Sequence, residues 1–156
     1  MNKICTDIRQ SKKLIELGID VKTADMHYMY RHWEIDENTI GSQSDASIGF
    51  DSDFYCGADN SKTYHYIPAW SLTALMNLLP SEFTEVGKYS TTIYKIDIRK
   101  YKFTDEVDLH QIAYGSYKWH EDGNSSWKDM INTGEKEDLL DAAFEMICWL
   151  KENDKI

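Results

Sequence analysis

The clearest hydrophobic pattern along the chain lies between Ser71 and Pro80. Apolar side chains recur there at i, i+3, i+4 and i+7, a spacing that gathers them on one face of an α-helix: Leu72, Leu75, Met76 and Leu79. Ser71 can cap the first turn with its hydroxyl, and Trp70 before it can pack on Leu75 as a hydrophobic staple. Pro80 ends the helix because proline has no amide hydrogen to donate. We therefore predict a short helix with one face buried in the core.

Helical patterns are also present near both ends of the chain. A first helix is predicted over residues 7–17, opened by Thr6 or Asp7 and closed by Gly18, since glycine suits the left-handed position after a helix. A longer helix is predicted from about residue 134 to residue 153, with the apolar stripe Leu139, Ala143, Met146, Ile147 and Leu150. We expect this last helix to be the main cover of a sheet.

Two stretches alternate apolar and polar residues with the period of two that is typical of β-strands. The first covers about residues 24–34 and alternates at Met26, Tyr28 and Tyr30. The second covers residues 91–99 and separates Lys95, Asp97 and Arg99 from the apolar positions Tyr94, Ile96 and Ile98. The second stretch predicts a half-buried strand with one face in water.

A β-hairpin is predicted further along the chain. One strand covers about residues 109–120, with Gly115 as a candidate bulge, and a second covers residues 126–130. Asp122 and Gly123 between them form a dipeptide typical of tight hairpin turns. Together with residues 91–99, these segments predict a meander of consecutive antiparallel strands.

The length and composition favour one globular domain. The chain has 156 residues, of which 42% are hydrophobic and 28% are charged, enough for one substantial core. We predict an α+β fold over residues 1–156, with an antiparallel sheet of about four to five strands packed by two to three helices in a single layer. Residues 35–64 are polar and rich in glycine, and we interpret them as a long loop that acts as a lid, an interaction loop or an inert excursion.

The net charge narrows the classes of partner. Lysine and arginine number 17 against 27 aspartates and glutamates, a formal charge of −10. This charge repels phosphate backbones, so we expect no direct nucleic-acid binding. Arg99, Lys100 and Lys102 form a local basic patch, which we interpret as a solvated strand end.

Cysteine usage and hydropathy predict a compartment. Cys5, Cys56 and Cys148 are odd in number and widely spaced, which favours reduced thiols over a disulfide framework or a cysteine-rich zinc site. The N-terminus has no apolar leader, and no stretch approaches the 18 apolar residues of a membrane span. We therefore expect a cytoplasmic protein without membrane association.

Known catalytic and metal-binding motifs are missing from the sequence. His27 and His32 are five residues apart, so neither a helix nor a strand places them on one face. A metal site built by the fold from His65, His110 and Asp59 remains open. The sequence contains no phosphate-binding glycine motif and no GxSxG elbow. Our interpretation leans against an enzyme, and no catalytic residue, cofactor or metal is predicted.

Aromatic residues are abundant, with 10 tyrosines, 5 tryptophans and 5 phenylalanines. Tyrosine and tryptophan are enriched at protein interfaces, yet they also fill cores and cross-strand pairs. We predict Tyr114, Tyr117 and Trp119 as anchors for a protein partner, provided that they are not all buried.

Several segments of the chain resemble a group of small uncharacterised proteins of bacterial prophages and mobile elements. The resemblance rests on four stretches and excludes the region around residues 35–64: Ile67–Pro80, Val86–Thr92, Leu109–Gly115 and Asp141–Leu150. It implies a genomic setting and no activity, so no functional residue follows from it.

The leading hypothesis is a non-enzymatic accessory factor that binds another protein, with a homo-oligomer left open. One alternative is an acidic inhibitor that mimics nucleic acid and blocks a host protein, which requires carboxylates gathered on one face. The other is a small hydrolase or metal-dependent enzyme with residues 35–64 as a lid, which requires a pocket with convergent histidine and carboxylate groups.

Overall fold

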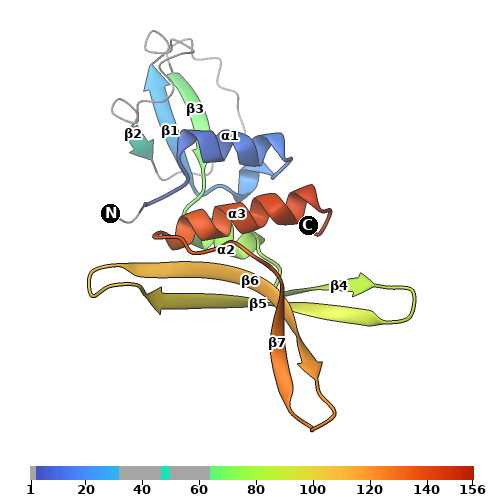
Figure 1. Cartoon of the computed structure of the whole chain (residues 1–156). Helices are drawn as coiled ribbons and strands as arrows, with labels where there is room; N and C mark the ends of the chain where they lie inside the picture. The colour runs from blue at the N-terminus through green and yellow to red at the C-terminus, as the bar shows by residue number, and fades with distance from the viewer. Residues whose placement is uncertain (1–2, 32–46, 50–63) are drawn as a thin grey trace. The chain divides into compact units, whose positions relative to one another are not determined.

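A computed structural model describes residues 3–31, 47–49 and 64–156. It has an α+β fold in which antiparallel sheets are accompanied by helices, as predicted (Figure 1). The chain divides into two compact units, Met1–Met76 and Asn77–Ile156, which we describe separately. The assignment of residues 1–156 to one domain stays a prediction.

The first helix of the N-terminal unit is set by local signals at both ends. Helix α1 (Ile8–Glu16) begins at Asp7, whose carboxylate accepts from the Gln10 amide while the Gln10 side chain accepts from the Asp7 amide. It is followed by Gly18 at φ 77°, and the amide of the next residue donates to the Leu14 carbonyl at 3.0 Å. This is a Schellman ending, so the predicted start and stop of the helix are confirmed.

Three strands form the sheet of the N-terminal unit. They are β1 (Met26–Arg31), β2 (Ser47–Gly49) and β3 (Tyr64–Ala69), in the antiparallel order β2-β1-β3. The strand predicted at residues 24–34 is thus present over Met26–Arg31, but it pairs in this separate sheet and not with the meander. Strand β2 lies within the predicted loop at residues 35–64, and most of that segment falls outside the described residues.

Trp70 connects helix α1 to the sheet through buried hydrogen bonds. Its amide donates to the Thr6 hydroxyl at 3.0 Å, and the Thr6 amide donates back to the Trp70 carbonyl at 2.9 Å. Its indole nitrogen donates at 2.9 Å to the hydroxyl of Thr23, the last residue of the short 3-10 helix η1 (Val21–Thr23). The Trp70 side chain is completely buried, so its one polar atom needs this partner.

The helix predicted from the clearest pattern is α2 (Leu72–Leu78). The Ala74 amide donates to the Ser71 hydroxyl at 3.2 Å, which confirms Ser71 as the cap. The same hydroxyl donates to Asp25 at 2.5 Å, which ties the start of the helix to the residue before β1.

The C-terminal unit is a four-stranded meander with one helix. Its strands follow chain order, β4-β5-β6-β7, and all pairs are antiparallel, which confirms the predicted meander. The bounds are β4 (Glu82–Val86), β5 (Thr91–Lys102), β6 (Asp108–Trp119), β7 (Ser125–Asn132) and α3 (Leu139–Glu152). Strand β4 was not predicted. Helix α3 begins later than expected because Asp138 caps it by accepting from the Leu140 amide at 2.9 Å.

Helix α3 covers one face of the meander, as predicted for the main cover (Figure 1). Ile112 and Tyr114 of β6 are completely buried on this face. The Phe83 ring of β4 lies 5.1 Å from the Tyr114 ring and 6.5 Å from the Trp149 ring of α3. We refer to the opposite side of the sheet as the open face.

Candidate functional site

Antiparallel registers define which residues share the open face. Lys95 lies opposite Gly115, Arg99 opposite Gln111, and Gly115 opposite Asp129. Since side chains alternate between faces along a strand, the open face carries these positions of the three long strands: Ile93, Lys95, Asp97, Arg99 and Tyr101 of β5, Gln111, Gly115 and Tyr117 of β6, and Trp127 and Asp129 of β7.

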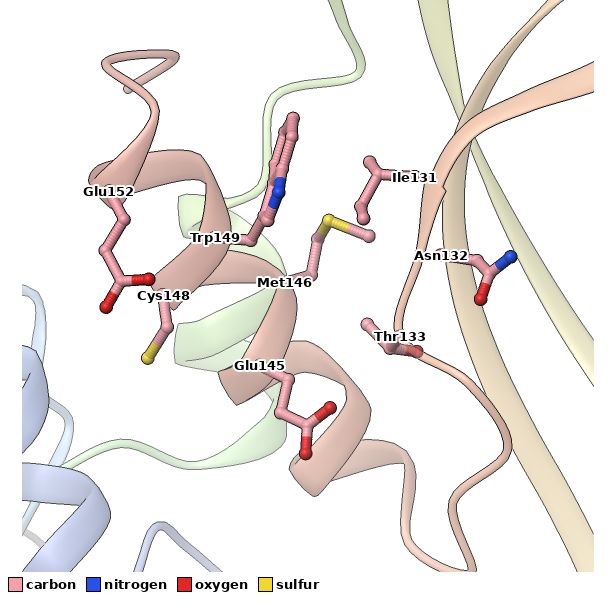
Figure 2. Close-up of a pocket in the computed structure, with 8 residues that line it drawn as sticks. All are labelled: Ile131, Asn132, Thr133, Glu145, Met146, Cys148, Trp149 and Glu152. Atoms are coloured by element: carbon pink, nitrogen blue, oxygen red, sulfur yellow. The ribbon is translucent and has the colours of Figure 1, made fainter.

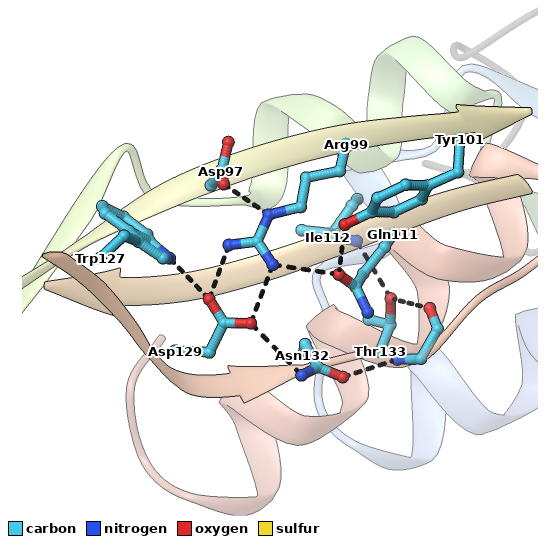
Figure 3. A network of polar contacts seen from close by, with 10 residues as sticks. Asp97, Arg99, Tyr101, Gln111, Ile112, Trp127, Asp129, Asn132 and Thr133 are labelled. Atoms are coloured by element: carbon cyan, nitrogen blue, oxygen red, sulfur yellow. Dashed lines mark hydrogen bonds and ion pairs between the residues drawn. The ribbon is translucent and has the colours of Figure 1, made fainter.

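Arg99 is the centre of a polar network on this face (Figure 3). Its two terminal nitrogens donate to both oxygens of Asp129, at 2.9 and 2.6 Å, and its Nε donates to Asp97 at 2.6 Å. One terminal nitrogen also donates to the Gln111 side chain at 3.2 Å, where the Tyr101 hydroxyl donates as well. A planar guanidinium held at three of its nitrogens has one orientation, so the network fixes β5 against β7 across β6.

The network also fixes the charges of its members. Hydrogen bonds from Arg99 hold the pKa of the Asp129 carboxyl below its usual range, and burial opposes this effect only in part. In return, the bond to Asp129 raises the pKa of Arg99. Next to the network, Lys100 pairs with Asp108 at 2.6 Å. Two cations of the basic patch that we interpreted as a solvated strand end are therefore neutralised by carboxylates.

Gly115 allows an aromatic side chain to lie against the sheet. A Cβ atom at this position would come within 2.6 Å of the Trp127 ring and 2.5 Å of the Lys128 carbonyl oxygen. The pairing of β6 with β7 shifts by one residue between Tyr114 and Gly115, so the predicted irregularity is confirmed, with the extra residue, Met130, in β7. Glycine in this strand marks a close approach of neighbouring atoms.

The Trp127 indole is held from two sides. Its nitrogen donates to Asp129 at 2.5 Å, which links it to the Arg99 network. The Tyr117 ring meets it edge to face, with ring centroids 5.2 Å apart. Tyr117 itself is 63% exposed, so the pair presents a large aromatic surface to solvent on a rigid base.

A groove opens where the strands of the meander diverge. Strand β5 pairs with β6 only from Lys95 onward, whereas its first half pairs with β4, and β6 continues with β7. The β4–β5 and β6–β7 hairpins therefore point in different directions (Figure 1). The cavity between them has a volume of about 420 Å³, and we call it the fork groove. It is lined by Thr91, Thr92, Ile93, Lys95, Gly115, Ser116, Tyr117 and Trp127.

A second cavity of about 260 Å³ lies between α3 and the end of β7 (Figure 2). Its lining residues are Ile131, Asn132, Thr133, Glu145, Met146, Cys148, Trp149 and Glu152. Neither this cavity nor the fork groove brings a histidine next to a carboxylate, the arrangement that the hydrolase alternative requires.

The structure separates the three predicted anchor residues. Tyr117 is exposed at the fork groove, but Tyr114 is 0% exposed and belongs to the core beneath α3. Burial raises the pKa of the Tyr114 hydroxyl, which donates to the Pro80 carbonyl. Tyr114 therefore cannot contact a partner, and its prediction as an anchor is corrected. The Trp119 side chain falls outside the described residues.

Trp127, Arg99 and Asp129 were not predicted as site residues. Trp127 lies four residues after Gly123 of the predicted turn, so antiparallel pairing across that turn could have placed it beside Tyr117. The network around Arg99 has no comparable signal, because Asp129 is brought to it by a third strand.

The metal site left open at His65, His110 and Asp59 cannot be assembled from the described residues, because Asp59 and the His65 side chain lie outside them. In the part of the chain that the structure describes, no group of three histidine, cysteine or acidic residues is placed to hold a metal ion. No helix of the described residues is both long and apolar enough to cross a membrane.

Comparisons with protein-family models, curated proteins and solved structures found no match for this chain.

Proposed function

We propose that this chain is a non-enzymatic accessory factor that binds another protein through the open face of its meander, at the fork groove. The observation that carries the proposal is the exposed Tyr117 ring, held edge to face against Trp127 beside a cavity of about 420 Å³. The cytoplasmic setting and the origin in a prophage or mobile element belong to the same proposal.

Rigidity supports this use of the open face. An exposed aromatic ring loses little conformational entropy on binding when its neighbours already hold it in place. Trp127 is held by Asp129, and Asp129 by Arg99. Tyrosine and tryptophan are also the residues that most often dominate binding energy at interfaces.

Apolar exposure extends the same surface. Ile93, on the other side of the fork groove, is 49% exposed and lies on the open face together with Tyr117. Adjacent exposed apolar side chains that are surrounded by polar residues are typical of interaction sites. A partner would therefore bury both walls of the groove at once.

The test compares two exposed tyrosines of the same unit. Tyr117→Ala removes the aromatic pair, whereas Tyr89→Ala removes a side chain that is 89% exposed in the β4–β5 turn, away from the groove lining. Each tagged protein is used to capture partners from the cell that produces it, and a captured protein is then purified and titrated by calorimetry. We expect binding to persist with Tyr89→Ala and to weaken by about 1–3 kcal/mol with Tyr117→Ala. Equal affinities for the two variants would refute the proposal.

A further inference from the structure

The fork groove contains two strand edges without a neighbour in the sheet. Residues Thr91–Tyr94 of β5 pair with β4 on one side, and no described strand pairs with them on the other. Residues Ser116–Trp119 of β6 pair with β7, and their other side is likewise unpaired among the described strands. Both unpaired sides border the fork groove, since β5 and β6 separate there.

Hydrogen bonds elsewhere in the sheet show which backbone groups face the groove. The amide and carbonyl of one residue in an antiparallel strand point to the same side, and those of the next residue to the other side. The Ile96 amide donates to the Ser81 carbonyl, on the β4 side, so the even-numbered residues of β5 direct their backbone groups toward β4. The odd-numbered residues Thr91 and Ile93 therefore direct theirs into the groove. The His110 amide donates to Lys136 on the β7 side.

The same alternation applies along β6. The even-numbered residue His110 bonds toward β7, and so does Ile112, whose carbonyl accepts from the Thr133 amide. The bulge adds its extra residue to β7 and leaves the alternation of β6 intact. Tyr117 therefore directs its amide and carbonyl toward the groove, opposite those of Ile93.

We propose that the fork groove captures an extended peptide segment of the partner protein, which adds as a β-strand between β5 and β6. This inference rests on the proposed function and specifies the form of the partner. Unpaired backbone donors and acceptors at a sheet edge recognise another extended chain, and neighbouring side chains supply the selectivity.

The side chains around the groove define the chemistry of the segment. Ile93, Tyr117 and Trp127 provide an apolar wall for a hydrophobic or aromatic residue of the peptide. Lys95 is the one charged residue among the lining residues of the groove, and it forms no ion pair with any described residue. An acidic residue of the peptide would complement it, so the favoured segment is extended, apolar and acidic.

The distribution of charge along the strands agrees with a groove that is kept open for pairing. Natural sheets protect exposed edges with charged residues, prolines or bulges. The outer strand β4 carries Glu82 and Glu85, and the outer strand β7 carries Lys128, Asp129 and the bulge. By contrast, the unpaired stretch Thr91–Tyr94 has neither a charge nor a proline, and the facing stretch Ser116–Trp119 has no proline and a single charge, Lys118.

The experiment uses a random library of linear peptides displayed on phage and the full chain as bait. Selected peptides are synthesised, labelled and titrated by fluorescence anisotropy, and each peptide amide is then methylated in turn. A strand between two edges bonds to β5 through alternate amides and to β6 through the amides between them, so strand addition predicts that methylation weakens binding at every position of a contiguous run of amides. Methylation of one such amide should weaken binding about three- to tenfold.

Two proline variants give a matched comparison on the protein side. Thr84 lies directly opposite Ile93, and both amides point away from the β4–β5 ladder, that of Ile93 into the groove and that of Thr84 to the outer edge. Ile93→Pro should therefore weaken peptide binding about tenfold, whereas Thr84→Pro should leave it within about twofold. Ile93→Ala measures the separate contribution of the side chain.

The outcomes separate this inference from the proposed function. Peptides that depend on Tyr117, but tolerate methylation of every amide and bind Ile93→Pro and Thr84→Pro equally, would overturn strand addition and leave the proposed binding at the open face intact. Failure to enrich any peptide would overturn capture of a linear segment. The calorimetric comparison of Tyr117→Ala with Tyr89→Ala would still decide whether the open face binds a partner protein. Concentration-dependent self-association that Ile93→Pro abolishes would assign the groove to a second copy of the chain and overturn the partner peptide.

Discussion

Replacing Gly115 by alanine tests whether the open face is as tightly packed as the structure shows. The new Cβ would lie 2.5 Å from the Lys128 carbonyl oxygen, whereas ordinary contact begins at 3.4 Å, so backbone or ring must move by about 0.9 Å. The Trp127 ring at 2.6 Å can move only by weakening its hydrogen bond to Asp129. The substitution therefore disturbs two strands and the aromatic pair together.

The expected magnitude follows from three contributions. Overpacking costs about 1–3 kcal/mol, and weakening a hydrogen bond to a charged group costs about 1.5–3 kcal/mol. Alanine in place of glycine lowers the conformational entropy of the unfolded chain, which stabilises the folded state by about 0.4–1 kcal/mol. We expect a net loss of about 3 kcal/mol in the free energy of unfolding, equivalent to a decrease of about 6–12 °C in Tm for a chain of this size.

Urea denaturation followed by circular dichroism measures the loss, and the indole NMR signal of Trp127 reports on its ring. Gly87→Ala is the matched control, because its Cβ would meet the Ser90 carbonyl at 3.2 Å, a contact relieved by a shift of a few tenths of an ångström. We expect this control to change stability by less than about 1 kcal/mol. If Gly115→Ala were as stable as Gly87→Ala and left the Trp127 signal unmoved, the close packing of Trp127 on Gly115 would be wrong.

Three further predictions concern single contacts, each measured by urea denaturation. Asp129→Asn should lower stability by about 1–2 kcal/mol at pH 7, because it weakens the bonds to Arg99. The pKa of Asp129 is depressed in the folded state, so the stability that its charge contributes is present above the unfolded pKa of about 4 and is lost as the pH falls through the folded pKa. The stabilities of wild type and Asp129→Asn should therefore converge in acid. A difference in stability that persists in acid would contradict this assignment. Asp138→Ala should cost about 1 kcal/mol through the lost cap of α3, and a neutral result would show that the cap is dispensable. Trp70→Phe should cost about 1–2 kcal/mol because the Thr23 hydroxyl loses its donor, and unchanged stability would indicate that water replaces the indole.

The helices could be predicted from the sequence because their signals are local. Asp7 and Gly18 define α1 within one turn of each end, and Ser71 does the same for the start of α2. The one clear error in a helix boundary is the start of α3. There the residues before Asp138 form an isolated bridge between Lys136 and His110, a contact that depends on tertiary structure.

The division of strands into two sheets could not be predicted, because partner choice depends on residues far apart in sequence. The hydrophobic alternation of β1 identifies a strand but does not say that β3 is its neighbour. Strand β4 has only five residues and an outer edge in solvent, so its apolar content is too small for a clear pattern.

The candidate site shows a different limit. Tyr114 and Tyr117 were grouped as anchors because they are close in sequence, yet they are three positions apart on a strand. An odd separation places side chains on opposite faces, so only one of the two can face solvent when a helix covers the sheet. The alternation along β6 therefore predicts that Tyr114 and Tyr117 lie on opposite faces of the sheet. Which of the two is exposed depends on the face that α3 covers, and α3 covers the face of Tyr114.

The two sheets differ in the length of the segments that connect their paired strands, and this difference determines how well each sheet tolerates insertions and deletions. Strands β1 and β3 pair from Arg31 with Tyr64, across the whole intervening segment. The entropy of closing a long segment grows only with the logarithm of its length, so doubling it costs about 0.6 kcal/mol. In the hairpin of β6 and β7, the turn around Gly123 sets the register, and one added residue would exchange the buried and exposed faces of a strand. Related chains should therefore vary in length between β1 and β3 and keep a constant length around Gly123.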